Sequence, residues 1–419
     1  MTILGIDPQL LRELVSTATG RSVPDAEVDD RFASSAWTSI AEPGDRHAGG
    51  LVAVLGPLAA LSAVIDRMPA DALSGRLRDA GAEDVPPPAE LQDALDRWAP
   101  RLSSKACLLA LKQAARFGVR LLVPSDAVWP DGLGDLGPFG PLALWVRGTD
   151  AALASLGGSA GPHGIALVGA RAATGYGEGV TMEASAGLVD RGYTIVSGAA
   201  YGIDGMAHRA ALASHGLTVA FLAGGLDRFY PSGHEDLLTR ITESGAVVSE
   251  VPCGTMPTKW RFLQRNRLIA AASQATVVLE AGWRSGSLNT AGHASALGRP
   301  LGAVPGPVTS VTSAGCHRLI RDYDAVCVTN ADEMAELAPL DTLPSPRSSQ
   351  PTAPKPAPEL TRLLDALSAR SPRTTTDVAA RAGLSVAVVQ GLLGSLQLEG
   401  GVKQSERGWT RVGDGVSGR

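Results

Sequence analysis

The sequence IALV at residues 165–168 is followed directly by GARAATGYG at residues 169–177. A short apolar run that leads through glycine-rich residues into a helical stretch predicts a strand, a loop and a helix. Glycines let the backbone approach an anion closely, and the helix N-terminus adds unpaired N–H groups. The spacing is not GxGxxG, which argues against a dinucleotide site. Arg171 suits a phosphate, although a plain glycine-rich turn is the alternative.

Short apolar runs and helical stretches alternate on both sides of this segment. The runs show no in-and-out alternation, which predicts a parallel sheet that is covered on both faces. A doubly wound domain of this kind binds ligands at the carboxyl ends of its strands. We expect strands at residues 120–123, 142–146, 165–168, 194–196, 218–222, 247–248, 276–279 and 301–304.

Two further loops follow strands of this predicted sheet. Residues 197–204, SGAAYGID, precede a helix that carries His208. Asp204 and His208 are four residues apart, but a metal site would need a third ligand. We therefore interpret Asp204 as an acid at a helix N-terminus and His208 as a packed histidine. In the second loop, residues 285–287, Ser-Gly-Ser, could bind another phosphate or simply cap a helix.

The segment KWRFLQRNR at residues 259–267 holds four cations, two aromatic side chains and no acid. Single-stranded nucleic acid needs cations for its phosphates and flat rings for its bases. If a helix begins here, Lys259, Phe262 and Arg265 share one face. The alternative is a solvated basic helix with buried aromatic rings. The candidate contacts are Lys259, Arg261, Arg265 and Arg267 for phosphates and Trp260 or Phe262 for a base.

Composition changes along the chain predict separate domains. Residues 1–103 have helical spacing of leucines with breaks rich in glycine and proline, and residues 104–338 carry the predicted sheet. Residues 339–357 are rich in proline and read as a linker. Residues 358–419 contain three helical stretches and a hairpin pattern, which together predict a winged-helix module.

Charge and cysteine content limit the possible functions. The net charge of −5 excludes a protein that coats nucleic acid by bulk charge, so any binding must come from local residues. The four cysteines are widely spaced, which fits a reducing cytoplasm. No apolar run could span a bilayer, and the N-terminus is not typical of a signal peptide. Without ligand spacing or a nucleophile motif, we expect no metal and no catalytic residues.

With these residues in view, the chain resembles the DNA-processing protein A family (DprA, also called Smf). The matching motifs follow the family's order and cover most of residues 104–330. Tyr201 is a departure, because many members carry a basic residue there. The motifs are GARAATGYG (169–177), SGAAYGIDGMAH (197–208), AGGLDRFYP (223–231), GAVVSE (245–250), FLQRNRLIAAAS (262–273), EAGWRSGSLNTA (280–291), VPG (304–306) and GCHRLI (315–320).

The resemblance implies an α/β fold: an extended Rossmann-like, doubly wound, mostly parallel sheet with an N-terminal helical domain and a C-terminal winged helix. It implies a cytoplasmic, non-enzymatic protein without cofactors. Such a protein binds single-stranded DNA, protects incoming DNA during natural transformation and loads the RecA recombinase, usually as a homodimer. The DNA-binding residues implied by motif are Gly169, Arg171, Thr174, Ser197, Gly198, Lys259, Phe262, Arg265, Asn266, Arg267, Ser285, Gly286 and Thr290.

Two other functions compete with this one. Related Rossmann-like enzymes hydrolyse nucleotide monophosphates and carry a PGGxGTxxE pattern. The last glutamate of that pattern has no counterpart within residues 280–291 here. A transcription regulator would use the winged helix to contact DNA. Its third helix, residues 385–398, carries no Lys or Arg, which a major-groove reader normally needs.

Overall fold

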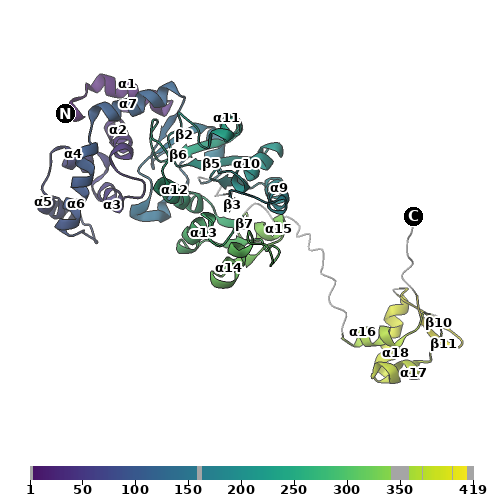
Figure 1. The fold of residues 1–419 in the computed structure, drawn as a ribbon. Helices are drawn as coiled ribbons and strands as arrows, with labels where there is room; N and C mark the ends of the chain where they lie inside the picture. Colours follow the sequence, from purple (N-terminus) through teal and green to yellow (C-terminus); the bar gives the residue numbers. More distant parts are fainter. Residues whose placement is uncertain (1–2, 158–162, 341–357, 370, 399, 413–419) are drawn as a thin grey trace. The chain divides into compact units, whose positions relative to one another are not determined.

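The structure, a computed structural model, divides into two units, residues 1–341 and residues 342–419 (Figure 1). The predicted linker at 339–357 lies outside the described residues except for Pro339 and Leu340. The described residues are 3–157, 163–340, 358–369, 371–398 and 400–412.

The first part of the larger unit is helical, as the leucine spacing predicts. Aspartates begin two of these helices: the side chain of Asp7 accepts from Leu10 N at 3.1 Å, and Asp45 accepts from His47 N at 3.0 Å. The elements are η1 (Ile3–Gly5), α1 (Pro8–Thr19), α2 (Asp25–Ile40), α3 (Arg46–Leu55), α4 (Pro57–Ile65), α5 (Ala70–Asp79), α6 (Pro88–Trp98), η2 (Ala99–Arg101) and α7 (Ser104–Arg116).

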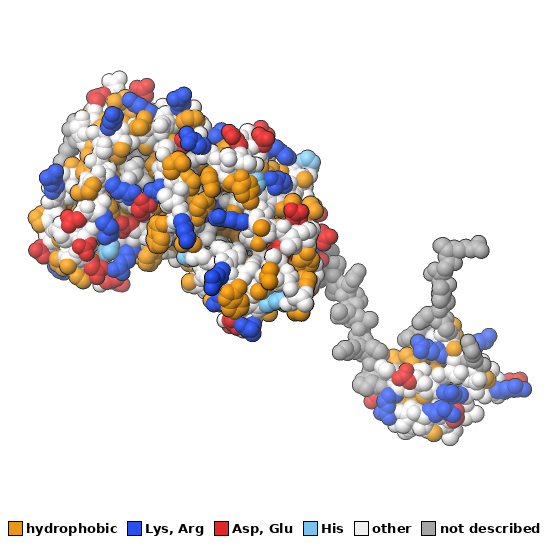
Figure 2. Space-filling model, viewed as in Figure 1, with side chains coloured by type: hydrophobic (Ala, Val, Ile, Leu, Met, Phe, Trp, Pro, Cys, Tyr) orange, Lys and Arg blue, Asp and Glu red, His pale blue; other side chains and the backbone are white. Residues whose placement is uncertain are grey.

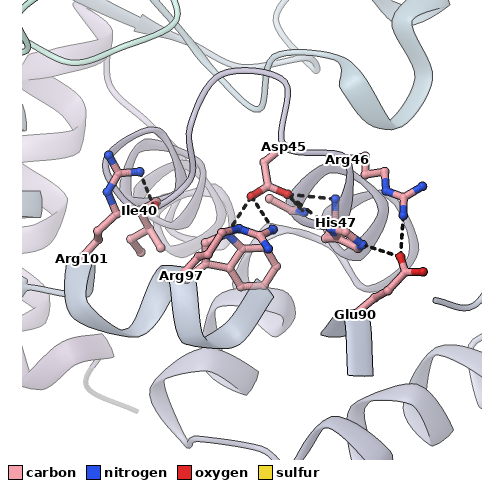
Figure 3. Close-up of polar contacts among 9 residues, drawn as sticks. Ile40, Asp45, Arg46, His47, Glu90, Arg97 and Arg101 are labelled. Carbon is pink, nitrogen blue, oxygen red and sulfur yellow. Dashed lines mark hydrogen bonds and ion pairs between the residues drawn. The ribbon is translucent and has the colours of Figure 1, made fainter. Parts of the chain in front are cut away.

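A polar network ties these helices together (Figure 3). Asp45 caps α3 and also accepts from the indole N–H of Trp98 at 3.0 Å and from Arg97 at 3.4 Å. His47 lies 3.2 Å from Glu90, which also pairs with Arg46. The start of α3 is therefore fastened to both ends of α6.

The sheet has nine strands in the order β1-β2-β6-β5-β4-β3-β7-β8-β9. The seven neighbouring strands β6-β5-β4-β3-β7-β8-β9 are parallel to one another. At the other edge, β1 pairs with β2 and β2 pairs with β6 in the antiparallel sense. The strands are β1 (Arg120–Leu122), β2 (Leu144–Gly148), β3 (Gly164–Gly169), β4 (Thr194–Ser197), β5 (Thr218–Leu222), β6 (Ala246–Ser249), β7 (Ala275–Glu280), β8 (Leu301–Ala303) and β9 (Val326–Cys327).

Both faces of the sheet are buried, which confirms the prediction from the continuous apolar runs. Along β5, Val219 and Phe221 pack into one core cluster, whereas Ala220 and Leu222 pack into another on the opposite face. Strand β9 was not among the predicted strands; it is two residues long, and both residues are exposed. The antiparallel pairing at one edge was not predicted either, because an apolar run carries no direction.

The connections between strands supply the covering helices (Figure 1). Residues 177–188 of α9 and 203–211 of α10 line one face, where they pack with β3 and β4. The elements are η3 (Asp131–Phe139), α8 (Asp150–Ala154), α9 (Gly175–Asp190), α10 (Ile203–Ala213), η5 (Ser232–His234), α11 (Glu235–Ser244), α12 (Lys259–Ala271), α13 (Ser287–Ala296), α14 (Ala314–Asp322) and α15 (Ala331–Glu336).

The N-terminal helices share a core with the sheet. Phe32 and Trp37 of α2 belong to the same buried cluster as Trp145 of β2 and Val247 of β6. The indole N–H of Trp145 donates to Thr38 Oγ1 at 3.1 Å. The two segments predicted as separate domains thus lie within one unit, and the boundary at residues 103/104 stays a prediction.

The smaller unit has the elements of a winged helix. Its core contains Leu363, Val378, Val389 and Leu393, so each helix contributes to it. Ser385 caps the third helix by accepting from Val388 N at 3.3 Å, as predicted. The elements are α16 (Pro358–Ala366), α17 (Thr375–Ala382), α18 (Val386–Leu398) and the antiparallel strands β10 (Val402–Ser405) and β11 (Gly408–Arg411).

In the part of the chain that the structure describes, no single helix has both the length and the apolar composition of a membrane span. Two sharply bent helix pairs, α3 with α4 and α17 with α18, meet that test only when taken together.

Candidate nucleic-acid interface

A cleft of about 870 Å³ lies where the order of the parallel strands reverses. Strand β3 has β4 on one side and β7 on the other, so the chain leaves β3 in one direction and later returns on its other side. Ligands of open α/β sheets bind at such a switch point, outside the carboxyl ends of the strands. The cleft is lined by residues 168–172 at and just beyond the end of β3, by residues 282–287 between β7 and the start of α13, and by the first turns of α12.

Exposed cations surround this cleft. Arg171 follows β3, Lys259 is the first residue of α12, and Arg284 lies in the loop between β7 and α13. All three are exposed, and none forms an ion pair with another described residue. The only acid that lines the cleft within the described chain is Asp204, which is buried. The cleft therefore presents net positive charge to an anionic ligand (Figure 2).

Aromatic side chains lie among these cations. Phe262 is half-buried, and its ring centroid is 5.6 Å from that of the exposed Tyr230. The guanidinium carbon of Arg171 lies 5.2 Å from the centroid of the Phe262 ring. Trp283, which is 53% exposed, lines the cleft from the loop after β7. Cations beside accessible rings are the combination that single-stranded nucleic acid requires.

Thr258 determines where the central helix begins. Its side chain accepts from Arg261 N at 3.3 Å and caps α12, which fixes the register of the basic segment. Lys259, Phe262 and Arg265 then fall on one face and all line the cleft. This placement agrees with the expected helical spacing.

Arg265 forms the floor of the cleft. Its guanidinium donates to the carbonyl oxygens of Gly198 at 2.7 Å and Phe221 at 2.5 Å, at the ends of β4 and β5. Burial lowers the pKa of Arg265 to about 10, while the charge of Asp204 acts in the opposite direction. Arg265 is thus a buried cation at neutral pH, and some of its N–H groups already donate to backbone carbonyl oxygens.

Asp204 and His208 have the structural roles that we expected. Asp204 lies in the first turn of α10 and accepts from Gly198 N at 3.2 Å. Burial raises the pKa of Asp204, although the charge of Arg265 lowers it. His208 is packed 2.7 Å from Thr218 Oγ1, and burial lowers its pKa to about 3. No group of three potential metal ligands occurs among the described residues.

The late loop and its helix complete the wall of the cleft. Ser285, Gly286 and Thr290, three of the residues predicted to bind DNA, line it. Asn266 also lines it and donates to Asn289 Oδ1 at 3.1 Å, which joins α12 to α13. On the β3 side, a Cβ on Gly169 would lie 2.6 Å from Ile203, so only glycine allows this close approach of loop and helix.

Four of the predicted site residues do not line the cleft. Thr174 caps α9 and donates to Glu280 Oε1 at 2.8 Å, and Ser197 donates to Leu167 O at 2.6 Å. Gly198 accepts from Arg265, and a Cβ there would collide with that guanidinium. Arg267 pairs with a buried acid, which is described below. These groups are already satisfied by the protein itself.

Two cations of the basic segment pair with acids instead of facing the cleft. Arg267, 3% exposed, donates to both carboxylate oxygens of Glu250 at 2.7 and 2.8 Å. Arg261 donates to Glu42 at 2.8 and 3.0 Å, and Arg101 contacts the same carboxylate. Although burial raises the pKa of Glu42, the hydrogen bonds from the two arginines lower it overall. These pairs anchor α12 to its own unit.

Tyr230, Trp283 and Arg284 also line the cleft and were not among the predicted site residues. The sequence carried a signal for Trp283 and Arg284, because they follow the predicted strand at 276–279 after only residues 280–282, at the edge where a site was expected. Tyr230 carried no such signal, since it follows β5 by several residues.

The fold and the cleft define a doubly wound α/β protein with a cationic, aromatic-lined cleft at its switch point. Residues 120–339 match the family described as DNA recombination-mediator protein A, and residues 346–406 match the DprA winged helix domain. The chain belongs to this family of DNA-processing proteins, the DprA/Smf proteins. Their names are those of DNA-processing proteins and not of enzymes that act on free nucleotides.

Individual relatives are similar over most of the larger unit. A DNA processing protein DprA from Mycobacterium tuberculosis is 46% identical over 302 residues, which are 69% of this chain and 76% of the relative. The crystal structure of DprA from Streptococcus pneumoniae is 28% identical, with a TM-score of 0.52, and the match covers 66% of this chain and 91% of that one. A structure that describes the single-stranded DNA binding mode of DprA from Helicobacter pylori is 28% identical over 52% of this chain and 94% of that one, with a TM-score of 0.46.

Proposed function

We propose that this protein binds single-stranded DNA in the cleft at the switch point of its sheet. The observation that carries the proposal is the combination of two features of the cleft. Arg171, Lys259 and Arg284 are exposed cations with no ion pair to a described residue, and Phe262 and Tyr230 offer accessible rings. The cations hold phosphates, and the rings offer faces for bases. Ser285, Gly286, Asn266 and Thr290 add polar groups along the same wall.

A single strand suits this cleft better than a duplex does. The bases of a duplex are stacked on one another and paired, so a ring inside a cleft cannot reach their faces. A single strand can turn its bases toward protein rings while its phosphates follow the cations. Every base has a flat face, so we expect little sequence preference.

We also propose that the bound strand is protected and delivered to the RecA recombinase, in the cytoplasm and by a homodimer. The support is the membership in a family described as recombination mediators, together with the motifs shared with DprA proteins. The widely spaced cysteines agree with a reducing compartment. Formation of RecA filaments on an oligonucleotide, measured with and without this protein, tests the delivery step.

The first prediction concerns the choice between single and double strands. At the same salt concentration, the full chain should bind an oligo-dT strand more tightly than a duplex of equal length. A gel-shift titration of both probes over several salt concentrations measures this difference. Equal or stronger binding of the duplex would contradict the proposed function.

The second prediction concerns the exposed cations. Arg171→Ala and Lys259→Ala should each weaken binding and flatten the slope of log K against log salt by about 0.7, because each residue neutralises about one phosphate of a single strand. Lys112→Ala is the matched control, since Lys112 is exposed on α7 and does not line the cleft. An unchanged slope in a folded Arg171 or Lys259 variant would remove that residue from the interface.

A further inference from the structure

Trp283 is a large apolar side chain that the fold leaves in contact with solvent. It is 53% exposed and lines the cleft from the loop between β7 and α13. A buried indole would contribute more to stability, so this exposed position is not explained by packing. Phe262 lines the same cleft from α12, so the two rings come from separate elements.

Arg318 of α14 holds the indole of Trp283 in place. Its guanidinium carbon lies 5.0 Å from the centroid of the Trp283 ring and 5.5 Å from that of Tyr323. The same guanidinium lies 3.4 Å from the Tyr323 hydroxyl and 3.8 Å from Asp322 Oδ2, so Arg318 is itself anchored. An aromatic ring has two faces, and Arg318 covers one of them. Because more than half of Trp283 stays exposed, part of the indole is accessible to a planar ligand, and the ring loses little freedom when it binds.

The neighbours of Trp283 fit a nucleotide. Arg284, the next residue, is exposed and lines the cleft without an ion pair to any described residue. Ser285 and Gly286 follow it on the same wall. A ring for a base therefore lies beside a cation and a hydroxyl group that can reach the adjoining phosphate.

We propose that Trp283 stacks on a base of the bound strand and is a second stacking position in addition to Phe262. This inference rests on the proposed function, because it assigns a further contact to the same cleft. It divides the strand between two elements: one base lies on the α12 side at Phe262, and another lies at the β7 loop with Arg284 on its phosphate.

The test compares variants of the full chain on two probes, an oligo-dT strand and a strand of the same length without bases. Trp283→Ala should bind oligo-dT about five- to tenfold more weakly, which is the lower end of the effect of losing one stacked base. The salt slope should not change, because no charge is lost. Trp283→Phe should recover most of the affinity. On the strand without bases, wild type and Trp283→Ala should bind equally.

Phe139→Ala is the matched control, because Phe139 is a 48% exposed aromatic residue at the end of η3 that does not line the cleft. It should bind oligo-dT like the wild type. Unchanged affinity of Trp283→Ala, or a loss that is the same on the strand without bases, would overturn the stacking role. In either case the proposed function stands if Arg171→Ala still weakens binding. Failure of the wild type to bind oligo-dT would instead overturn the proposed function itself.

Discussion

Phe262→Ala should weaken the binding of single-stranded DNA by about five- to a hundredfold without changing the salt slope. The Phe262 ring is half-buried and lies between the guanidinium groups of Arg171, at 5.2 Å, and Arg265, at 5.9 Å from its centroid. A base that stacks on this ring displaces Arg171, whose contact with the half-buried ring is worth about 0.5–2 kcal/mol. The freed guanidinium can then hold the phosphate of the same nucleotide.

The measurement combines binding with stability on the same protein. The titration uses oligo-dT, and the melting temperature of each variant shows whether the fold survives. Phe139→Ala is a matched control, since Phe139 is 48% exposed and does not line the cleft. Phe262 also contacts Tyr230, so its alternative role is packing. A large drop in melting temperature with unchanged affinity of the folded fraction would assign it that role.

Arg267→Ala should lower the free energy of unfolding by about 3–5 kcal/mol and leave the salt slope of DNA binding unchanged. The substitution removes both hydrogen bonds to Glu250, whose side chain is 10% exposed, and leaves that carboxylate buried without its cation. It also removes the donor to the carbonyl oxygen of Phe139, at 2.9 Å. Denaturant unfolding measures the loss of stability.

The double variant Arg267→Met with Glu250→Leu separates the two roles of this arginine. Apolar residues of similar volume often replace a buried ion pair at little cost, so the double variant should regain most of the lost stability. It should also bind oligo-dT like the wild type. A stable Arg267→Ala protein with a flatter salt slope would show that this cation faces DNA after all.

The central segment illustrates why a basic pattern cannot assign contacts by itself. Residues 259–267 lie in one helix, as predicted, but the cations of this helix make different contacts. Lys259 lines the cleft, Arg261 pairs with Glu42, and Arg267 pairs with Glu250. The partner of Arg261 is 219 residues away in the chain, so no local pattern could identify it.

The amino-acid sequence by itself determined the class of fold and the edge of the sheet at which the cleft lies. Continuous apolar runs mark buried parallel strands, and the glycine-rich loops that follow them mark their carboxyl ends. It also placed Lys259, Phe262 and Arg265 on one helical face, because the spacing of side chains on a helix is a local property.

Only the tertiary structure decided which cations remain free and which rings meet at the cleft. The order of the strands brings the loops after β3 and β7 together and adds Trp283 and Arg284 to the wall. The same packing pairs Arg261 with Glu42 and Arg267 with Glu250, and neither arginine lines the cleft. Charge pairing and burial depend on contacts between residues far apart in the chain, and those contacts exist only in the folded protein.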